Sequence, residues 1–476
     1  MSDSLSTRAS RSLSGTGILA ALVAVLGVSA GCSDIGNSSP PFVPDLVNVR
    51  FQERANGIEI TDEQQQQVAD ILMGIFGTPD QPDDPFGGGA ESVLARAGFD
   101  VDKLKIAAGP VSSTEEGLNH GLYRKHCVHC HGITGDGAGP TAAFLNPYPR
   151  DYRHGRFKFK STFSGAKPTR ADLKRILMEG APGTSMPSFR LLPDNEIEAL
   201  IEYVIYLSVR GETERKLTGL LAVDGFLPPE EGTIEDKGVL VAGGLPLAID
   251  DGEAEEPEID NIVATLMYEW YTAKDQVIIP ADVPPMALAE TKADYDASVA
   301  IGRELFYGKA ANCYSCHGDS AQGDGQANDY HYRFTWRKEL TGLEGDELAE
   351  AIAVFRESGA LRPRNAIPRN LRHGIFRGGR RPIDIYYRIY SGIYGTPMPG
   401  LGSERDAQAA AEAMAENATA GDEGDDDGAD GGVKKVSPED IWHLVNYVKS
   451  LHLEPFSRPI EPMRLGAARE PASVGR

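Results

Sequence analysis

Cysteine is scarce in this sequence: its 476 residues include only five, and four of these form the pairs Cys127/Cys130 and Cys313/Cys316. So few cysteines, placed so closely in pairs, argue against a disulfide scaffold and indicate two bound cofactors. Aromatic residues make up 8% of the chain and hydrophobic residues 41%. That composition suffices for two or three ordinary globular domains and excludes a polytopic membrane protein.

Basic residues are also in short supply, with 47 Lys and Arg against 70 Asp and Glu and a net charge of −23. We therefore expect no nucleic-acid partner. Two stretches account for most of the excess of acidic over basic residues. Residues 224–260 have a net charge of −11, and residues 404–430 have a net charge of −9. Both are rich in Gly, Ala and Asp and poor in aromatics. This composition is typical of solvated spacers, and a specific docking tail is the alternative.

The chain begins with the features of an export signal. Residues 1–14 are polar with two arginines, and an apolar run at residues 17–28 follows, too short for a confident membrane-spanning helix. The run ends in Ser-Ala-Gly-Cys, which resembles a bacterial lipobox, although such motifs usually have Leu in place of Ser29. We therefore predict a signal peptide at residues 1–31 and a diacylated Cys32. The alternative is ordinary cleavage that leaves one free cysteine.

Residues 32–110 are expected to form a lipid-anchored tether followed by a helical segment. Thr61 and Gln64 have the spacing of a capping box at the start of a helix. An apolar stripe at helical spacing follows, made of Val68, Ile71, Leu72, Ile75 and Phe76. Gly77 and Pro79 should end this helix.

The remaining chain is an internal repeat of four sequence blocks in one order. The first copy has CVHCHG at 127–132, PRDYRHGRF at 149–157, GAPGTSMP at 180–187 and LIEYVIYL at 200–207. The second copy has CYSCHG at 313–318, PRNLRHGIF at 368–376, GIYGTPMP at 392–399 and LVNYVKSL at 444–451. This duplication predicts two tandem modules, at 111–210 and 294–455, joined by an acidic linker at 211–293. A disordered acidic insert at 402–435 and a C-terminal tail at 456–476 complete the chain.

Both copies are predicted to be mainly α-helical. The closing block of each has apolar residues at i, i+3, i+4 and i+7, beginning at Leu200 and at Leu444. No sustained alternating pattern of the strand type competes with this reading. Residues 326–366 are expected to be a long loop that lengthens the second copy.

Each Cys-x-x-Cys-His motif can attach a porphyrin. Two thiols one helical turn apart can each add to a vinyl group, and the adjacent His131 or His317 then faces the iron as a ligand. A zinc site would need four ligands, yet the two cysteine pairs lie in separate copies. A redox-active Cys-x-x-Cys would sit in a βαβ context that the sequence lacks. The motifs therefore indicate two covalently bound c-type haems.

Each copy also supplies one Gly-x-x-Gly-Thr-x-Met-Pro segment, which contains Met186 or Met398. A thioether on a short loop held by Gly and Pro can reach the opposite face of a haem and complete its coordination. A buried methionine is usually core filler, but here the Met-Pro pair recurs in the same order and context. We therefore predict that both methionines bind iron.

The motifs together resemble class I c-type cytochromes, and more closely the dihaem, membrane-tethered cytochromes of bacterial respiratory chains. The resemblance spans residues 111–210 and 294–455 and implies two small helical domains, each wrapped around a covalent haem c. It makes four cysteines the thioether attachment points: Cys127, Cys130, Cys313 and Cys316. It makes His131 and His317 the proximal iron ligands, and Met186 and Met398 the distal ligands.

Cations gather between the haem motif and the methionine of each copy. Residues 150–175 and 362–388 each carry a net charge of +7. Haem propionates need cationic partners, an acidic redox partner could dock there, or the chain's own acidic inserts could cover these faces. His154 and His373, each preceded by Arg, are expected to bind a propionate or to hold a loop rather than to bind iron.

These features predict an exported dihaem cytochrome, anchored by lipid at Cys32 on the periplasmic side of a bacterial membrane. It should carry single electrons between a membrane respiratory complex or dehydrogenase and a terminal acceptor, such as an oxidase or a soluble cytochrome. We expect an electron carrier and not an enzyme, because a six-coordinate iron has no open site for substrate. The alternatives are a dihaem cytochrome c peroxidase and a permanent cytochrome subunit of an oxidase or dehydrogenase complex.

Overall fold

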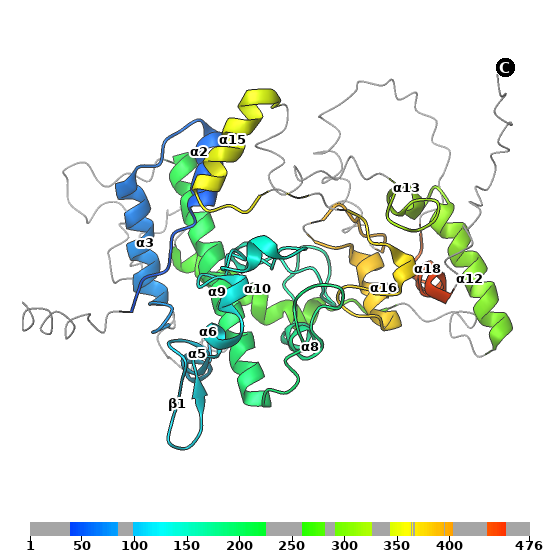
Figure 1. Cartoon of the computed structure of the whole chain (residues 1–476), viewed down its shortest axis with the longest axis horizontal. Helices are drawn as coiled ribbons and strands as arrows, with labels where there is room; N and C mark the ends of the chain where they lie inside the picture. The colour runs from blue at the N-terminus through cyan, green and yellow to red at the C-terminus, as the bar shows by residue number, and fades with distance from the viewer. Residues whose placement is uncertain are drawn as a thin grey trace, which may run out of the picture. The chain divides into compact units, whose positions relative to one another are not determined.

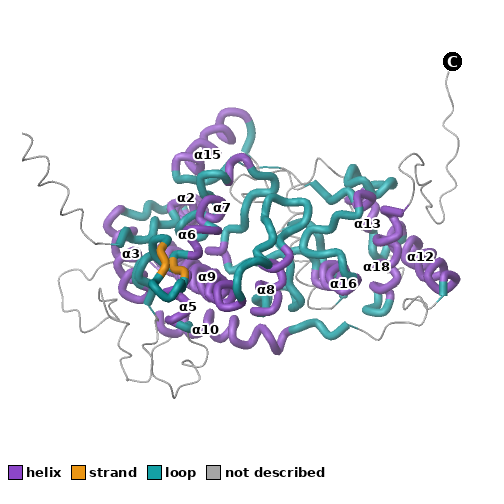
Figure 2. Tube along the Cα trace, turned by 60° about the horizontal axis from the view of Figure 1, so that its bottom comes forward, coloured by secondary structure: helices purple, strands orange, loops and turns teal. Residues whose placement is uncertain are grey.

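The described part of the chain is mainly helical, as the sequence predicts (Figures 1 and 2). The computed structural model describes residues 39–83, 99–224, 259–280, 291–325, 343–362, 364, 367–394, 396–402 and 436–453. Within these ranges the only strands with a partner strand are β1 (Ser112–Ser113) and β2 (Asn119–His120), which form a short antiparallel hairpin. None of the described helices is long and apolar enough to cross a membrane.

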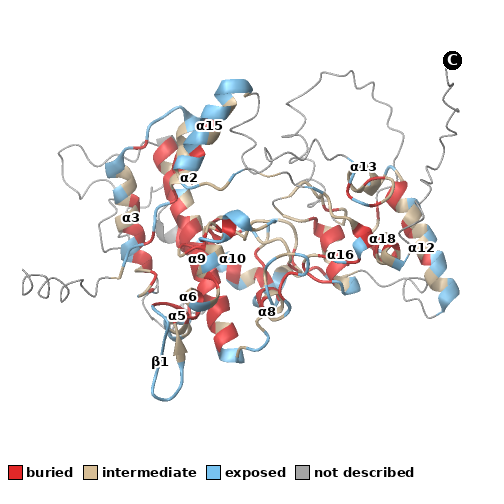
Figure 3. Ribbon diagram, viewed as in Figure 1, coloured by how far each residue is buried: buried red, intermediate tan, exposed pale blue. Residues whose placement is uncertain are grey.

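Helix α9 (Asp194–Asp224) is the central element of the first copy, and most of its residues are buried (Figure 3). Several elements pack against it: α2 (Leu46–Asn56), α3 (Asp62–Phe76), α5 (Val101–Ala107), α6 (Leu122–His126), α8 (Arg170–Glu179), α10 (Ile259–Thr272) and the 3₁₀ turn η2 (Tyr152–His154). The N-terminal segment, the first copy and α10 therefore share one hydrophobic core.

Parts of the predicted linker at 211–293 are helical and pack with the first copy. Helix α9 continues through residues 211–224, and the segment from α10 to the 3₁₀ turn η3 (Ala273–Gln276) is helical with buried apolar side chains. Residues 211–224 look polar in sequence, but their polar groups are buried against the N-terminal segment, where Glu214 accepts a hydrogen bond of 2.7 Å from the backbone NH of Asp45. The acidic residues between 225 and 258 lie outside the described ranges.

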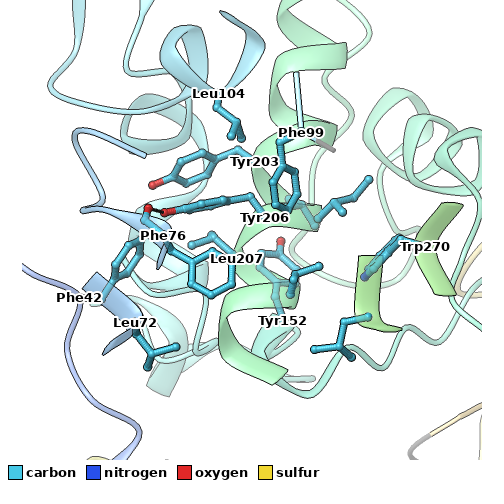
Figure 4. Close-up of a cluster of buried hydrophobic side chains, with 14 of the residues drawn as sticks. Phe42, Leu72, Phe76, Phe99, Leu104, Tyr152, Tyr203, Tyr206, Leu207 and Trp270 are labelled. Carbon is cyan, nitrogen blue, oxygen red and sulfur yellow. Dashed lines mark hydrogen bonds between the residues drawn. The ribbon is translucent and has the colours of Figure 1, made fainter. Parts of the chain in front are cut away.

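Helix α3 forms as predicted. Thr61 and Gln64 make the reciprocal hydrogen bonds of a capping box, and the backbone of Gly77, at a φ of 68°, ends the helix. All five residues of the predicted apolar stripe are buried. Figure 4 shows Phe76 of this helix beside Tyr206 of α9, and the Tyr206 hydroxyl donates a hydrogen bond to the Phe76 carbonyl.

The second copy has its own hydrophobic core. Helix α12 (Lys292–Tyr307) packs closely on α18 (Asp440–Ser450), and α16 (Pro382–Ser391) packs on the same helix. The closest approach is at Gly302, where any side-chain carbon would collide with the backbone of His443. The 3₁₀ turns η5 (Leu371–His373) and η6 (Leu451–Leu453) cover one end of this core.

The prediction that residues 326–366 form one long loop is wrong for the part that the structure describes. Residues Gly345–Glu357 form helix α15, which packs on α2 with the rings of Phe51 and Phe355 4.5 Å apart. The buried side chains of Ala351 and Phe355 pack against Val47 and Phe51 of α2, and this contact stabilises α15. The sequence did carry the signal, since Leu348, Ala351, Ile352 and Phe355 lie at helical spacing.

Segments of the two copies touch directly. Arg175 donates a hydrogen bond of 2.8 Å to the carbonyl of Gly378 in the second copy, while Thr162 forms an isolated antiparallel bridge with Val277 of the connecting segment. The ring of Phe163 lies 6.1 Å from that of Tyr390. These contacts bring the basic segment of the first copy against the basic segment of the second.

Truncating Leu72 to Ala tests whether α3 belongs to the core of the first copy. Leu72 is fully buried, so Leu72→Ala should lower the free energy of unfolding by about 2–5 kcal/mol. Its neighbour Met73 is 47% exposed, and Met73→Ala should change it by less than about 0.5 kcal/mol. Denaturant unfolding followed by circular dichroism measures both. Equal midpoints for the two variants would contradict the placement of α3.

Candidate functional site

Each Cys-x-x-Cys-His motif forms a short helix that presents its two thiols and its imidazole together. In the first copy Cys127 precedes α7 (Val128–His131), and the backbone NH groups of Cys130 and His131 both donate to the Cys127 carbonyl. In the second copy the motif is α13 (Cys313–His317). All four cysteines are free thiols.

A backbone carbonyl holds the imidazole of each motif. The His131 Nδ1–H donates a hydrogen bond of 3.0 Å to the carbonyl of Arg150, and the His317 Nδ1–H donates one of 3.0 Å to the carbonyl of Arg369. Arg150 and Arg369 occupy the same position in the repeated PRxxRHG block. Because a carbonyl can only accept, the bond fixes the tautomer and leaves Nε2 as the ring nitrogen with a free lone pair.

Burial keeps these groups uncharged. It lowers the pKa of His131 to about 4 and also lowers the pKa of His317. It raises the pKa of the Cys127 and Cys313 thiols to about 12. A neutral imidazole is the form that binds a metal ion, whereas a thiol with a raised pKa is unlike the reactive thiolate of a redox-active Cys-x-x-Cys.

The loop after each histidine wraps back over the motif in the same way. The Gly137 NH donates to the His131 carbonyl at 2.9 Å, and the Gly323 NH donates to the His317 carbonyl at 2.8 Å. Two residues further on, Gly139 and Gly325 donate to the second cysteine of their motif. A side chain at either of these two glycines would collide with the motif's own backbone, so the close return of the loop requires glycine there.

The two methionine segments also fold alike. The Met186 NH donates to Thr184 Oγ1 at 3.1 Å, and the Met186 carbonyl accepts from the Ala181 NH at 3.2 Å. Met398 makes the same bonds with Thr396 Oγ1, at 3.3 Å, and with the Ile393 NH, at 3.1 Å. Each methionine side chain is partly buried against the hydrophobic core of its own copy.

The PRxxRHG block of the first copy is held by ion pairs. Arg153 is buried and pairs with Asp151, at 2.9 Å, and with Asp45 of the N-terminal segment, at 3.0 Å. His154 Nε2 lies 3.5 Å from Asp151. Burial alone would raise the pKa of Asp151, but Arg153 and His154 hold this pKa well below its usual range. His154 thus contacts the loop carboxylate, which fits the predicted loop-holding role.

One contact at the histidine was missed in the sequence. The ring of Tyr152 stacks on the ring of His131, with centroids 4.6 Å apart and an interplanar angle of 14°. The equivalent residue in the second copy is Leu371, and both backbone NH groups donate to the loop after the motif, at Gly135 and Ala321. The signal was the aromatic residue at one of the three positions where the two blocks differ.

The donor set of each copy fits a covalently held haem. The residues are two free thiols one helical turn apart, an imidazole whose Nε2 makes no hydrogen bond to any described residue, and a thioether on a tight loop. Within the described ranges no group of three or more His, Cys, Asp or Glu side chains is arranged to hold a metal ion. Cys32 lies outside those ranges.

Comparisons with known proteins agree with this chemistry for the first copy. Residues 119–204 match the family described as cytochrome c oxidase, cbb3-type, subunit III. A search of curated proteins gave no significant match. One similar solved structure is the Kuenenia stuttgartiensis reducing HAO-like protein complex Kustc0457/Kustc0458, with 19% identity over 71% of this chain and 97% of that chain and a TM-score of 0.35.

The family match and the Cys-x-x-Cys-His geometry together identify a c-type cytochrome domain at residues 119–204. Such a domain implies a covalently attached haem c and a role in electron transfer.

Exchanging Tyr152 and Leu371 tests whether the stacked ring makes the two sites unequal. A buried phenol stabilises ferric iron better than an aliphatic side chain does, because the surrounding polarity tunes the potential. We expect Tyr152→Leu to raise the midpoint potential of the first haem and Leu371→Tyr to lower that of the second. Spectroelectrochemical titration measures both. If each substitution moved the two potentials equally, the local contact would not be the cause.

Proposed function

We propose that this protein is an exported, lipid-anchored dihaem c-type cytochrome. It carries single electrons between a membrane respiratory complex or dehydrogenase and a terminal acceptor on the periplasmic side of a bacterial membrane. It acts as a carrier and not as an enzyme.

The observation that carries this proposal is the matched geometry of the two copies. Each has its Cys-x-x-Cys-His helix, a histidine Nδ1–H bonded to the carbonyl of an equivalent arginine, and a methionine loop with the same hydrogen bonds. The family match covers only the first copy. The second haem therefore rests on this equivalence.

The proposed roles follow from the donor atoms. The thiols of Cys127, Cys130, Cys313 and Cys316 would attach the two haems, the Nε2 atoms of His131 and His317 would each bind an iron, and the thioethers of Met186 and Met398 would supply the second protein ligand of each iron. Bound in this way, a haem iron takes up and releases one electron at a relatively high potential. The carbonyls of Arg150 and Arg369 keep each imidazole oriented, so that little rearrangement accompanies the change of charge.

Substituting each methionine tests the ligation. The ferric protein should show the weak near-infrared band of sulfur-to-iron charge transfer at an intensity that corresponds to two haems. Met186→Ala and Met398→Ala should each remove about half of that band and lower the potential of only the affected haem. Met73→Ala, on the exposed side of α3, is the matched control and should leave the band unchanged.

The same measurements separate a carrier from a peroxidase. A peroxidase needs one iron with a displaceable sixth ligand, whereas here both copies have an equivalent methionine loop. A wild-type near-infrared band with the intensity expected for only one haem, together with hydrogen peroxide turnover at about 1 s⁻¹ or faster, would overturn the carrier proposal in favour of the dihaem peroxidase.

Substituting Cys32 tests the anchor. Two or more acyl chains, each stabilised by about 0.8 kcal/mol per buried CH₂ group, retain a protein at a membrane where a single chain does so only marginally. Cys32→Ser should therefore abolish lipidation and release the exported protein into the soluble fraction. Fractionation and mass spectrometry of the N-terminal peptide measure the outcome. A wild-type protein that begins at another residue and carries no lipid would refute the anchor.

A further inference from the structure

Most cations of the basic segment 150–175 already have partners inside the protein. Arg153 pairs with Asp45 and Asp151, while Lys167, Arg170 and Lys174 pair with Glu212, Glu202 and Glu198 respectively. Lys160 and Arg175 donate to backbone carbonyls. Arg150 and Lys158 make no hydrogen bond or ion pair of their side chains with any described residue. These two are therefore the partly buried cations of the segment that still need an anion.

The basic segment of the second copy leaves one comparable group. Arg364, Arg369, Arg372 and Arg388 donate to backbone carbonyls, and Arg381 pairs with Asp384. Arg377 differs, because its Nε is buried and has no hydrogen-bond partner in the described part of the chain. A buried guanidinium donor without an acceptor is costly and calls for an anion.

The contacts between the copies bring these cations together. Gly378 lies against the ring of Phe159, so that Lys158 and Arg377, the residues that precede them, are neighbours. Arg150 and Arg377 both act on Lys158, and together with its burial they lower the pKa of Lys158 to about 7. The carboxylate closest to Arg150 is Asp151, which is already paired with Arg153 and His154. The cluster thus has three cations and no uncommitted acid among the residues described.

The cluster lies beside both candidate haem sites. The carbonyl of Arg150 holds His131, while Arg377 neighbours Arg369, whose carbonyl holds His317. Gly183, three residues before Met186 of the first copy, lies against the Arg369 guanidinium of the second. Carboxylates are the anions that suit such a site, since they accept charge-assisted hydrogen bonds from Arg and Lys, and each haem carries two propionates.

We propose that Arg150, Lys158 and Arg377 form one shared site for haem propionate carboxylates from both copies. Such a site would bring the propionates of both haems to the junction of the copies and would allow the haems to exchange electrons directly. This inference rests on the proposed dihaem function and adds an internal electron-transfer step to it.

The test uses the full-length holoprotein with Lys158→Gln and Arg377→Gln. Removing a cation near a haem stabilises its ferric form, so each substitution should lower the midpoint potentials of both haems. The variants Arg377→Lys and Arg380→Gln are the controls: the first keeps the charge, and the second removes an exposed charge three residues away. Neither should shift either potential much. Soret circular dichroism of the wild type should show an exciton couplet, which both Gln variants should diminish.

The outcomes separate the possible sources of the carboxylates. If Arg377→Gln shifts no potential, or only one, the shared site is refuted. The acidic stretch 404–430 could supply the carboxylates instead, and then deletion of residues 407–432 would change the size of the shift that Arg377→Gln causes, which would refute propionate binding. Fewer than two haems in the pyridine haemochrome assay would overturn the dihaem function itself, whereas two haems with no exciton couplet would overturn only their close approach.

Discussion

The hydrogen bond from each histidine Nδ1–H to an arginine carbonyl is the constraint on which both sites depend. It fixes the ring that we propose to bind iron, and it does so only if the backbone at residues 150 and 369 stays in place. In the first copy that backbone is held by Arg153, which ties the loop to Asp45 in the N-terminal segment. Asp45 in turn pairs with Arg215 of α9. The position of one imidazole therefore depends on residues far away in sequence.

In the second copy the equivalent backbone is held by a contact within the same copy. Arg372, the counterpart of Arg153, donates a hydrogen bond of 2.7 Å to the carbonyl of Ser320 in the loop after its own motif. The repeated PRxxRHG block therefore has a different set of hydrogen-bond and ion-pair partners in each copy. In the first copy the N-terminal segment supplies the carboxylate that the buried Arg153 needs, whereas in the second copy a carbonyl of the same copy is the acceptor.

The local features of the sites could be predicted from sequence, and the long-range ones could not. The Cys-x-x-Cys-His helices, the methionine loops and the capping box of α3 depend on residues a few positions apart, so spacing alone indicates them. The extent of α9 depends on Asp45 covering Glu214 across 169 residues, and no periodicity reveals that. The carbonyls behind the histidines were missed because a backbone acceptor leaves no mark in the sequence.

The distribution of charge follows from the same packing. Of the cations in the basic segments, several pair with glutamates or aspartates and others donate to backbone carbonyls, while Arg156, Arg170, Arg362, Arg380 and Arg381 are exposed. A basic docking face for an acidic partner would need exposed cations, because steering acts through solvent-exposed charge. The net +7 of the first segment therefore overstates the attraction that an acidic partner would feel, because Asp45, Glu198, Glu202 and Glu212 offset part of that charge. The partly buried cations Arg150, Lys158 and Arg377 lie where the two copies meet, and haem propionates are their proposed partners.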